Sequence, residues 1–249
     1  MIARQEIINR LKSELKQNQF VFAFWLEGAD AHKRVDKYSD IDIWLDVKDD
    51  KEDEVFKLIE IILTKLGKID FAHEKDHPHP KIRQKFFHLE KTSEFLIIDV
   101  CIQKHSRIFY YTKEYKDEKA KVIFDKTDGI ITFKKLDKQK FMKENQERLK
   151  ELEKTFIFFQ AWINKEINRK KFLEAFYNYQ EKTLKPLVEI LRLKFEPTKK
   201  DFYINGIYSD LPKRYLTKLE NLYKINSLED LKIKNKQAND LFFEIIKKF

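Results

Sequence analysis

The most informative stretch of the sequence is an alternating segment that carries two aspartates. Asp40 and Asp42 are separated by one residue in the pattern Asp-Ile-Asp-Ile, and alternate residues of a β-strand point to the same face. Two residues along a strand lie about 7 Å apart at the backbone, so their carboxylates can converge on a hard cation, which prefers oxygen ligands. This spacing predicts a divalent-metal site on one face of a strand.

A third carboxylate, Asp99, is the only charged residue in the apolar segment FLIIDVCI. A buried carboxylate is costly unless it is paired or bound to a metal. A cation shared by Asp40, Asp42 and Asp99 would meet that need, and two Mg²⁺ ions about 3.5–4 Å apart are a common arrangement for nucleotidyl transfer. We therefore predict these three aspartates as the metal ligands and catalytic residues.

Gly28, one of four glycines in the chain, ends an apolar run and precedes a predicted short helix over residues 30–37. Glycine lets the backbone approach a ligand closely, and a helix N-terminus after a tight turn offers N–H groups to phosphate. We expect phosphate at Gly28 and Ala29, the metal at the aspartates, and the reacting phosphorus between them.

Hydrophobic periodicity predicts the elements that position these residues. Apolar residues at helical spacing predict helices over residues 2–16 and 51–66. Segments of strand length and pattern cover residues 20–28, 40–47, 81–90, 93–103, 121–125 and 131–135. Long helical patterns follow over residues 137–168, 170–194, 211–224 and 227–247. The fold class is therefore α+β, with an N-terminal half that contains the strands and an all-helical C-terminal half.

Composition points to a globular protein rather than a disordered or membrane-spanning one. Hydrophobic residues make up 42% of the 249 residues and charged residues 37%, and no run approaches the ~18 apolar residues of a membrane span. Cys101 is the only cysteine, which excludes an internal disulfide and favours a cytoplasmic location. The net charge of +9 suits anionic partners such as a nucleoside triphosphate or nucleic acid.

Gly28-Ala29, a gap of ten residues, Asp40-Ile-Asp42 and the later Asp99 together resemble the nucleotidyltransferase superfamily of the DNA polymerase beta type. The family pattern is Gly-Gly or Gly-Ser, a spacer of similar length, Asp-hydrophobic-Asp or Glu, and a third carboxylate on a nearby strand. Residues 77–103 and 197–223 are similar to segments of small bacterial members related to aminoglycoside and lincosamide nucleotidyltransferases.

The resemblance implies a mixed β-sheet catalytic domain over residues 1–136 and a helical substrate-binding bundle over residues 137–249. It implies Mg²⁺-dependent transfer of AMP from ATP, or of another nucleoside monophosphate, to a hydroxyl of a small molecule, with release of pyrophosphate. The acceptor would be an aminoglycoside or lincosamide antibiotic. Asp40 and Asp42 would hold both metal ions, and Asp99 would bind the metal near the acceptor hydroxyl and help to deprotonate it.

The resemblance also assigns the nucleotide-binding residues. Gly28 and Ala29 would cradle the β- and γ-phosphates, and Ser39 would line the same pocket. The family usually has Gly or Ser where this chain has Ala29, so the backbone N–H remains and the hydroxyl is lost. Lys33 and Arg34 either grip the triphosphate or are ordinary surface charge.

Arg83 and the adjacent Gln84 occupy a predicted strand that leads into the hairpin of Asp99. They either reach the nucleotide pocket or lie on a solvated strand face.

Three functions remain open on the sequence. The first is a nucleotidyltransferase for a small hydroxylated molecule, with the helical half as the acceptor pocket. The second is a nucleotidyltransferase for RNA or for a toxin protein partner, which the positive net charge favours. The third is a non-enzymatic nucleotide-binding module, which Ala29 favours and the three aspartates oppose.

Overall fold

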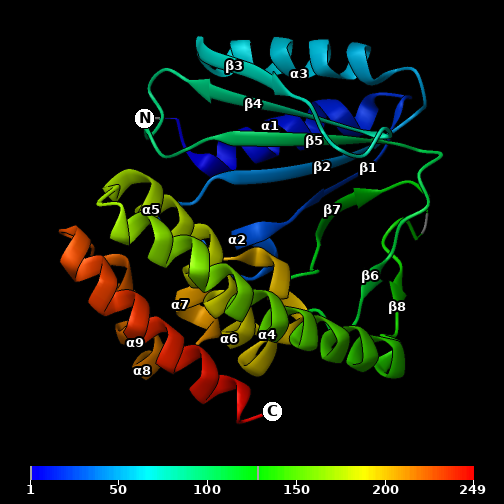
Figure 1. The fold of residues 1–249 in the computed structure, drawn as a ribbon. Helices are drawn as coiled ribbons and strands as arrows, with labels where there is room; N and C mark the ends of the chain where they lie inside the picture. Colours follow the sequence, from blue (N-terminus) through cyan, green and yellow to red (C-terminus); the bar gives the residue numbers. More distant parts are fainter. Residues whose placement is uncertain (1, 128) are drawn as a thin grey trace. The chain divides into compact units, whose positions relative to one another are not determined.

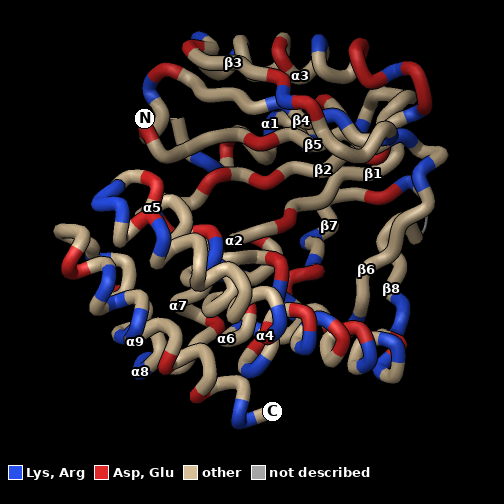
Figure 2. Tube along the Cα trace, in the orientation of Figure 1, with Lys and Arg blue, Asp and Glu red and all other residues tan. Residues whose placement is uncertain are grey.

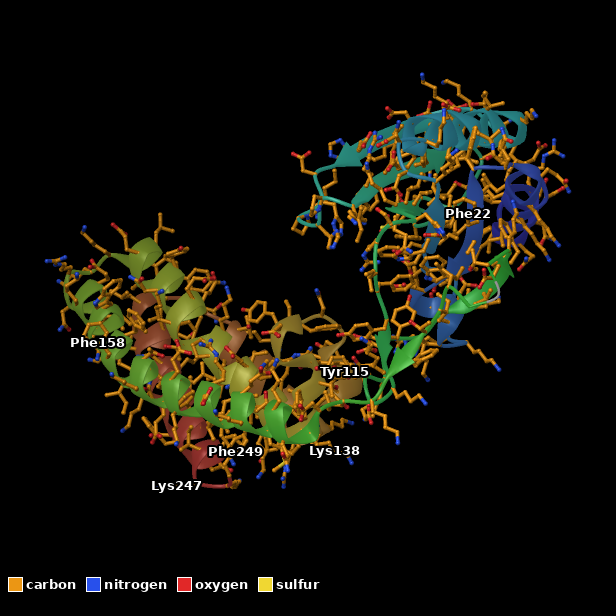
Figure 3. The ribbon with its side chains drawn as sticks, turned by 90° about the vertical axis from the view of Figure 1, so that its right-hand side faces the viewer. Phe22, Tyr115, Lys138, Phe158, Lys247 and Phe249 are labelled. Atoms are coloured by element: carbon orange, nitrogen blue, oxygen red, sulfur yellow. The ribbon has the colours of Figure 1, made fainter. Side chains whose placement is uncertain are left out.

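The computed structural model describes residues 2–127 and 129–249, and the chain divides into two compact units, Met1–Lys135 and Leu136–Phe249. We call them the sheet unit and the helical unit. Each has a hydrophobic core of its own. Figure 3 labels Phe22 in the sheet unit, and Lys138 and Phe158 on the first helix of the helical unit. The predicted α+β class, with a mixed sheet followed by a helical region, is confirmed.

The sheet unit contains a six-stranded sheet in the order β3-β4-β5-β2-β1-β7 (Figure 1). β2 and β5 are parallel and the other neighbouring pairs are antiparallel, so the sheet is mixed. Its strands are β1 (Val21–Leu26), β2 (Ile41–Val47), β3 (Ile69–Lys75), β4 (Ile82–Leu89), β5 (Ile98–Lys104) and β7 (Lys121–Asp125). A separate short pair is formed by β6 (Tyr111–Thr112) and β8 (Phe133–Lys134).

One face of the sheet is apolar and the other carries polar groups. On β2 the inward residues are at most 1% exposed, as the alternation predicts: Ile41, Ile43, Leu45 and Val47. They pack with the apolar sides of α1 (Arg4–Gln17) and α3 (Glu52–Leu66). We call this side the core face. The alternate residues, which begin with Asp42 and Trp44, lie on the opposite side, which we call the polar face.

In the sheet unit one predicted helix has other bounds, and one strand lies where no element was predicted. The helix expected over residues 30–37 is instead α2 (Gly28–Ala31), which starts at the glycine. It stops early because Lys33 adopts a left-handed conformation with φ of 55° and turns the chain. β3 was not predicted, because it is an edge strand whose residues are almost all exposed and therefore show little hydrophobic alternation.

The helical unit contains eight helical segments between residues 136 and 249. They are α4 (Lys138–Asn168), α5 (Phe172–Tyr179), the π-helical η1 (Gln180–Leu184), α6 (Lys185–Phe195), the 3₁₀ segment η2 (Pro197–Phe202), α7 (Ile207–Asp210), α8 (Lys213–Tyr223) and α9 (Leu228–Ile246). The helix predicted over residues 170–194 is thus interrupted by a π-turn. None of the helices in the described residues combines the length and apolar character needed to cross a membrane.

Candidate active site

Two of the predicted catalytic aspartates are neighbours on the polar face of the sheet. The parallel register of β2 and β5 pairs Asp42 with Asp99. Neighbouring strands lie about 4.8 Å apart, so the two carboxyl groups leave adjacent points of the same face. Asp40 directly precedes β2, and its side chain is exposed.

The electrostatics of the site are dominated by buried negative charge. The pKa of Asp42 is raised to about 7, first by burial and then by the negative charges of Asp40, Asp99 and Glu27. Burial also raises the pKa of Asp99, although the amide of Gln84 opposes that shift. Among the described residues no side chain donates a hydrogen bond to the Asp42 carboxylate. The cluster is therefore one that a bound cation would stabilise.

Position 28 requires a glycine because its backbone lies very close to the side chain of Asp42. Its φ is 53°, and a Cβ added to it would lie 1.8 Å from Oδ2 of Asp42. The preceding residue, Glu27, donates its backbone N–H to the carbonyl of Asp42 at 3.0 Å. The end of β1 and the start of α2 are therefore held directly against the carboxylate, which is a space that only glycine leaves open.

Arg4, on the first turn of α1, ties the motif together and was not predicted from the sequence. Its Nη2 donates to Oδ2 of Asp30 at 2.5 Å and to the backbone carbonyl of Asp40. The charge of Arg4 also lowers the pKa of Asp42. Lys121 of β7 contacts the other oxygen of Asp30 at 3.5 Å. One arginine thus fixes both ends of the segment between Gly28 and Asp42.

Gln84 and Arg83, adjacent on β4, lie on opposite faces of the sheet. Nε2 of Gln84 donates to both carboxylate oxygens of Asp99, at 3.0 and 2.8 Å. Arg83 instead donates to Glu74 at 2.7 Å and to Asp53 at 2.6 Å. The structure therefore brings Gln84 to the aspartates, and it does not bring Arg83 there.

The other predicted nucleotide-binding residues lie on α2 and on the segment between α2 and β2. The hydroxyl of Ser39 donates to the carboxylate of Asp36 and accepts from its backbone N–H, both at 2.9 Å. Lys33 and Arg34 are exposed, and their side chains form no hydrogen bond or ion pair within the described part of the chain. The carbonyl of Ala29 accepts the backbone N–H of Arg34 at 3.0 Å. Their contribution to triphosphate binding stays a prediction.

Aromatic residues and a fourth carboxylate flank the aspartates, and sequence reasoning missed them. Oε1 of Glu27 accepts hydrogen bonds from the hydroxyl of Tyr111 and from the indole of Trp25, and burial raises its pKa. Trp25 stacks on Trp44 and on Phe109, with ring centroids 5.9 and 5.8 Å apart. Phe109 and Tyr111 come from a segment without clear hydrophobic periodicity, so no pattern marks them. Glu27 directly precedes Gly28, and this position could have identified it as a site residue.

The aspartates match the chemistry of a hard divalent cation. They offer only carboxylate oxygens, which are the ligands that Mg²⁺ prefers, and the bare backbone of Gly28 leaves room for Oδ2 of Asp42. Within residues 2–127 and 129–249, however, no three side chains of the metal-binding types converge closely enough to hold an ion. The donor set therefore fits Mg²⁺, and binding requires the carboxylates to turn toward a shared ion.

No protein-family model matches the chain, and neither does any curated protein. Two solved structures match it over nearly its full length. One is an aminoglycoside 6-adenyltransferase from Bacillus subtilis, with 16% identity, a TM-score of 0.38, and coverage of 99% of this chain and 90% of that one. The other is a spectinomycin adenyltransferase from Enterococcus faecialis with ATP and spectinomycin, with 14% identity, a TM-score of 0.36, and coverage of 98% and 100%.

Both matched structures are adenyltransferases, and each shares at most 16% of its residues with this chain. ATP and spectinomycin are ligands of the second protein alone. The function of this chain has to follow from its own side chains.

Proposed function

We propose that this protein is a metal-dependent nucleotidyltransferase that moves a nucleoside monophosphate, AMP from ATP, to a hydroxyl group and releases pyrophosphate. The pairing of Asp42 with Asp99 on the polar face, beside Asp40 and against Gly28, carries this proposal. Burial, together with the negative charges of Asp40, Asp99 and Glu27, raises the pKa of Asp42 to about 7, and a bound Mg²⁺ would offset both effects.

The side chains of the site have distinct roles in this reaction. Asp40, Asp42 and Asp99 would hold Mg²⁺, which supplies charge neutralisation for the phosphates and activation of the attacking hydroxyl. Asp99, oriented by the two hydrogen bonds from Gln84, takes the proton of the acceptor hydroxyl. The backbone N–H groups at Gly28 and Ala29 would bind the β- and γ-phosphates.

A small hydroxylated acceptor, such as an aminoglycoside or lincosamide antibiotic, is the first candidate. The helical unit contains a pocket of about 470 Å³, which is in the size range of small-molecule sites. Its apolar lining includes Ile207, Leu216 and Leu219, and its polar groups include Glu220 and Tyr223. A mostly apolar pocket with a few polar groups supports a small acceptor.

An RNA or protein acceptor is the second candidate, and the net charge of +9 favours it. Opposite charges are nevertheless interspersed along α4 in Figure 2, where Arg148 pairs with Glu151 and Lys143 with Glu147. A helix with alternating signs offers no continuous basic surface. The charge pattern therefore favours the small acceptor.

The decisive experiment incubates the purified protein with Mg²⁺-ATP and a panel of aminoglycosides, lincosamides, tRNA and candidate proteins, and measures pyrophosphate release. We expect release that depends on a small hydroxylated acceptor and is lost in Asp40→Asn. Asp76→Asn, in the exposed β3–β4 loop, is the matched control and should retain activity. Release only with RNA or a protein would support the second candidate. No release with any acceptor or nucleotide would leave a nucleotide-binding module.

A further inference from the structure

Arg107 lies among the aromatic residues of the polar face, within reach of the charge of Glu27, and the sequence analysis assigns it no role. It follows β5, the strand that carries Asp99. Its guanidinium carbon is 5.9 Å from the ring centroid of Trp44 and 4.9 Å from that of Phe109. Trp44 is the next residue after Asp42 on the same face of β2. The guanidinium thus lies over two aromatic rings, and one of them follows Asp42 on the polar face.

A buried relay fixes one edge of this guanidinium. Nη1 of Arg107 donates to Oε1 of Gln103 at 2.6 Å, and Nε2 of Gln103 donates to Oδ1 of Asp46 at 3.0 Å. Gln103 and Asp46 are both 0% exposed. The second oxygen of Asp46 contacts Nδ1 of His105 at 2.5 Å. Because each member is held by the next, the orientation of Arg107 is set by its neighbours.

The other edge of the Arg107 guanidinium carries N–H donors that have no hydrogen-bond partner. Nε of Arg107 is buried and has no hydrogen-bond partner, and within the described residues Nη2 forms no hydrogen bond either. Burial lowers the pKa of Arg107, and Tyr111 and Glu27 oppose that shift, but Arg107 and Glu27 form no ion pair in the described part of the chain. A buried donor without a partner is costly, and an anion arriving at this edge would satisfy it.

We propose that Arg107 binds the polyphosphate of the nucleotide substrate, with Gln103 and Asp46 as its positioning residues. The inference rests on the proposed nucleotidyl transfer and names a polyphosphate ligand for the same site. The remaining edge of the planar guanidinium, formed by Nε and Nη2, offers two parallel N–H donors that match two phosphate oxygens. Arg107 lies beside Glu27, the residue before Gly28, so this anion site adjoins the predicted phosphate cradle.

The test is calorimetric titration of the full-length protein with Mg²⁺-ATP, with tripolyphosphate in Mg²⁺, and with adenosine. In Arg107→Gln we expect the affinities for ATP and tripolyphosphate to fall about 10- to 100-fold, because a charged hydrogen-bond donor is lost. Arg107→Lys keeps the positive charge but lacks the paired N–H donors of the planar guanidinium. Its affinity should therefore lie between those of Arg107→Gln and wild type. Adenosine binding should not change. Arg10→Gln, which removes a surface ion pair with Glu14 on α1, is the matched control.

Gln103→Leu tests the positioning relay. It should weaken tripolyphosphate binding and raise the KM for ATP while leaving kcat nearly unchanged, an outcome that a purely structural role does not produce. Because Gln103 is fully buried, circular dichroism checks the fold of this variant. Gln103→Met, which keeps the length of the side chain and removes both amide hydrogen bonds, is the second variant and should weaken tripolyphosphate binding in the same way.

The possible results separate this inference from the proposed function. Tripolyphosphate binding that is absent, or equal in wild type and Arg107→Gln, would overturn the inference. Equal losses for adenosine and tripolyphosphate would also overturn it, since they would make Arg107 structural. Arg107-dependent tripolyphosphate binding without pyrophosphate release from any acceptor would overturn the proposed function and leave the inference standing.

Discussion

The carboxyl group of Asp42 is the most constrained chemical group of the candidate site. Its backbone lies in β2, its Oδ2 lies against Gly28, and its neighbours Asp40 and Asp99 carry the same charge. In the metal-free protein, protonation relieves this repulsion. Mg²⁺ and protons should therefore compete for the same carboxylate.

This competition predicts an unusual pH dependence of stability. The pKa of Asp42 is about 7 in the fold, above its ordinary value of 3.8, so between these pH values the folded state binds a proton that the unfolded state has lost. The unfolding free energy of the metal-free protein should therefore fall as pH rises from about 4 through about 7. Urea unfolding across this range should show a smaller decrease in Asp42→Asn than in wild type.

Asp76→Asn is the control for this measurement and should keep the wild-type slope. An identical slope in Asp42→Asn would show that the carboxyl group does not titrate with a raised pKa. Adding Mg²⁺ should stabilise wild type most above about pH 7, where the carboxylate is free of its proton.

Gly28→Ala is predicted to lower the unfolding free energy more than an alanine substitution at another glycine with a left-handed backbone conformation. The new Cβ would meet Oδ2 of Asp42 at 1.8 Å, while Gly206, with a φ of 68°, has its nearest neighbours at 3.8 and 3.9 Å. Gly206→Ala therefore measures backbone strain alone, which is about 1–2 kcal/mol. Chemical denaturation should show a larger loss for Gly28→Ala, together with loss of pyrophosphate release. Equal losses and retained activity would contradict the close contact.

At the scale of elements, the site depends on α1 as well as on the strands. The apolar side of α1 belongs to the core of the sheet unit through Ile7, Leu11 and Leu15, so the helix is held there independently of Arg4. Arg4 then reaches from its first turn to Asp30 and to the carbonyl of Asp40. The helix is thus both part of the core and an anchor for the motif.

Arg4→Gln is predicted to reduce turnover with little loss of fold. The helix remains packed, but the segment that bears Asp40 loses its anchor, and small displacements of catalytic groups lower rates by about 10- to 100-fold. Steady-state kinetics of pyrophosphate release would measure this loss, and far-ultraviolet circular dichroism would report the helix content. Arg10→Gln on the same helix should behave as wild type. Unfolding of Arg4→Gln would instead make Arg4 a residue of the fold.

At the scale of the whole molecule, each unit has a separate hydrophobic core. The boundary between the units follows β8 and precedes α4. All residues proposed here for the metal and the polyphosphate belong to the sheet unit. The pocket proposed for a small acceptor belongs to the helical unit.

A fragment of residues 1–135 is therefore predicted to fold and to bind Mg²⁺-ATP, because it retains its core and every proposed nucleotide-binding residue. It should not show acceptor-dependent pyrophosphate release. Calorimetry with a non-hydrolysable ATP analogue tests binding, and chemical denaturation tests folding. A folded fragment without affinity for the nucleotide would assign part of the nucleotide site to the helical unit.

The sequence by itself determined the strand that carries Asp42 and directly follows Asp40, its buried face, the α+β class and the change to helices near residue 136. These features are local, because alternation along a strand and periodicity along a helix are visible in consecutive residues. Sequence patterns did not predict the short α2 or the edge strand β3. A four-residue helix is too short to show helical periodicity, and an exposed edge strand shows no alternation of apolar and polar residues.

Only the tertiary structure decided which side chains surround the aspartates. The register of β4 against β5 pairs Gln84 with Cys101, two residues after Asp99 on the same face, so the amide of Gln84 reaches Asp99. Arg83 lies on the other face, and no local pattern distinguishes these two neighbours. Arg4 and Arg107 reach the site from distant parts of the chain. Such contacts are set by strand pairing and by the packing of α1, which depend on interactions between residues far apart in the sequence rather than on any short segment.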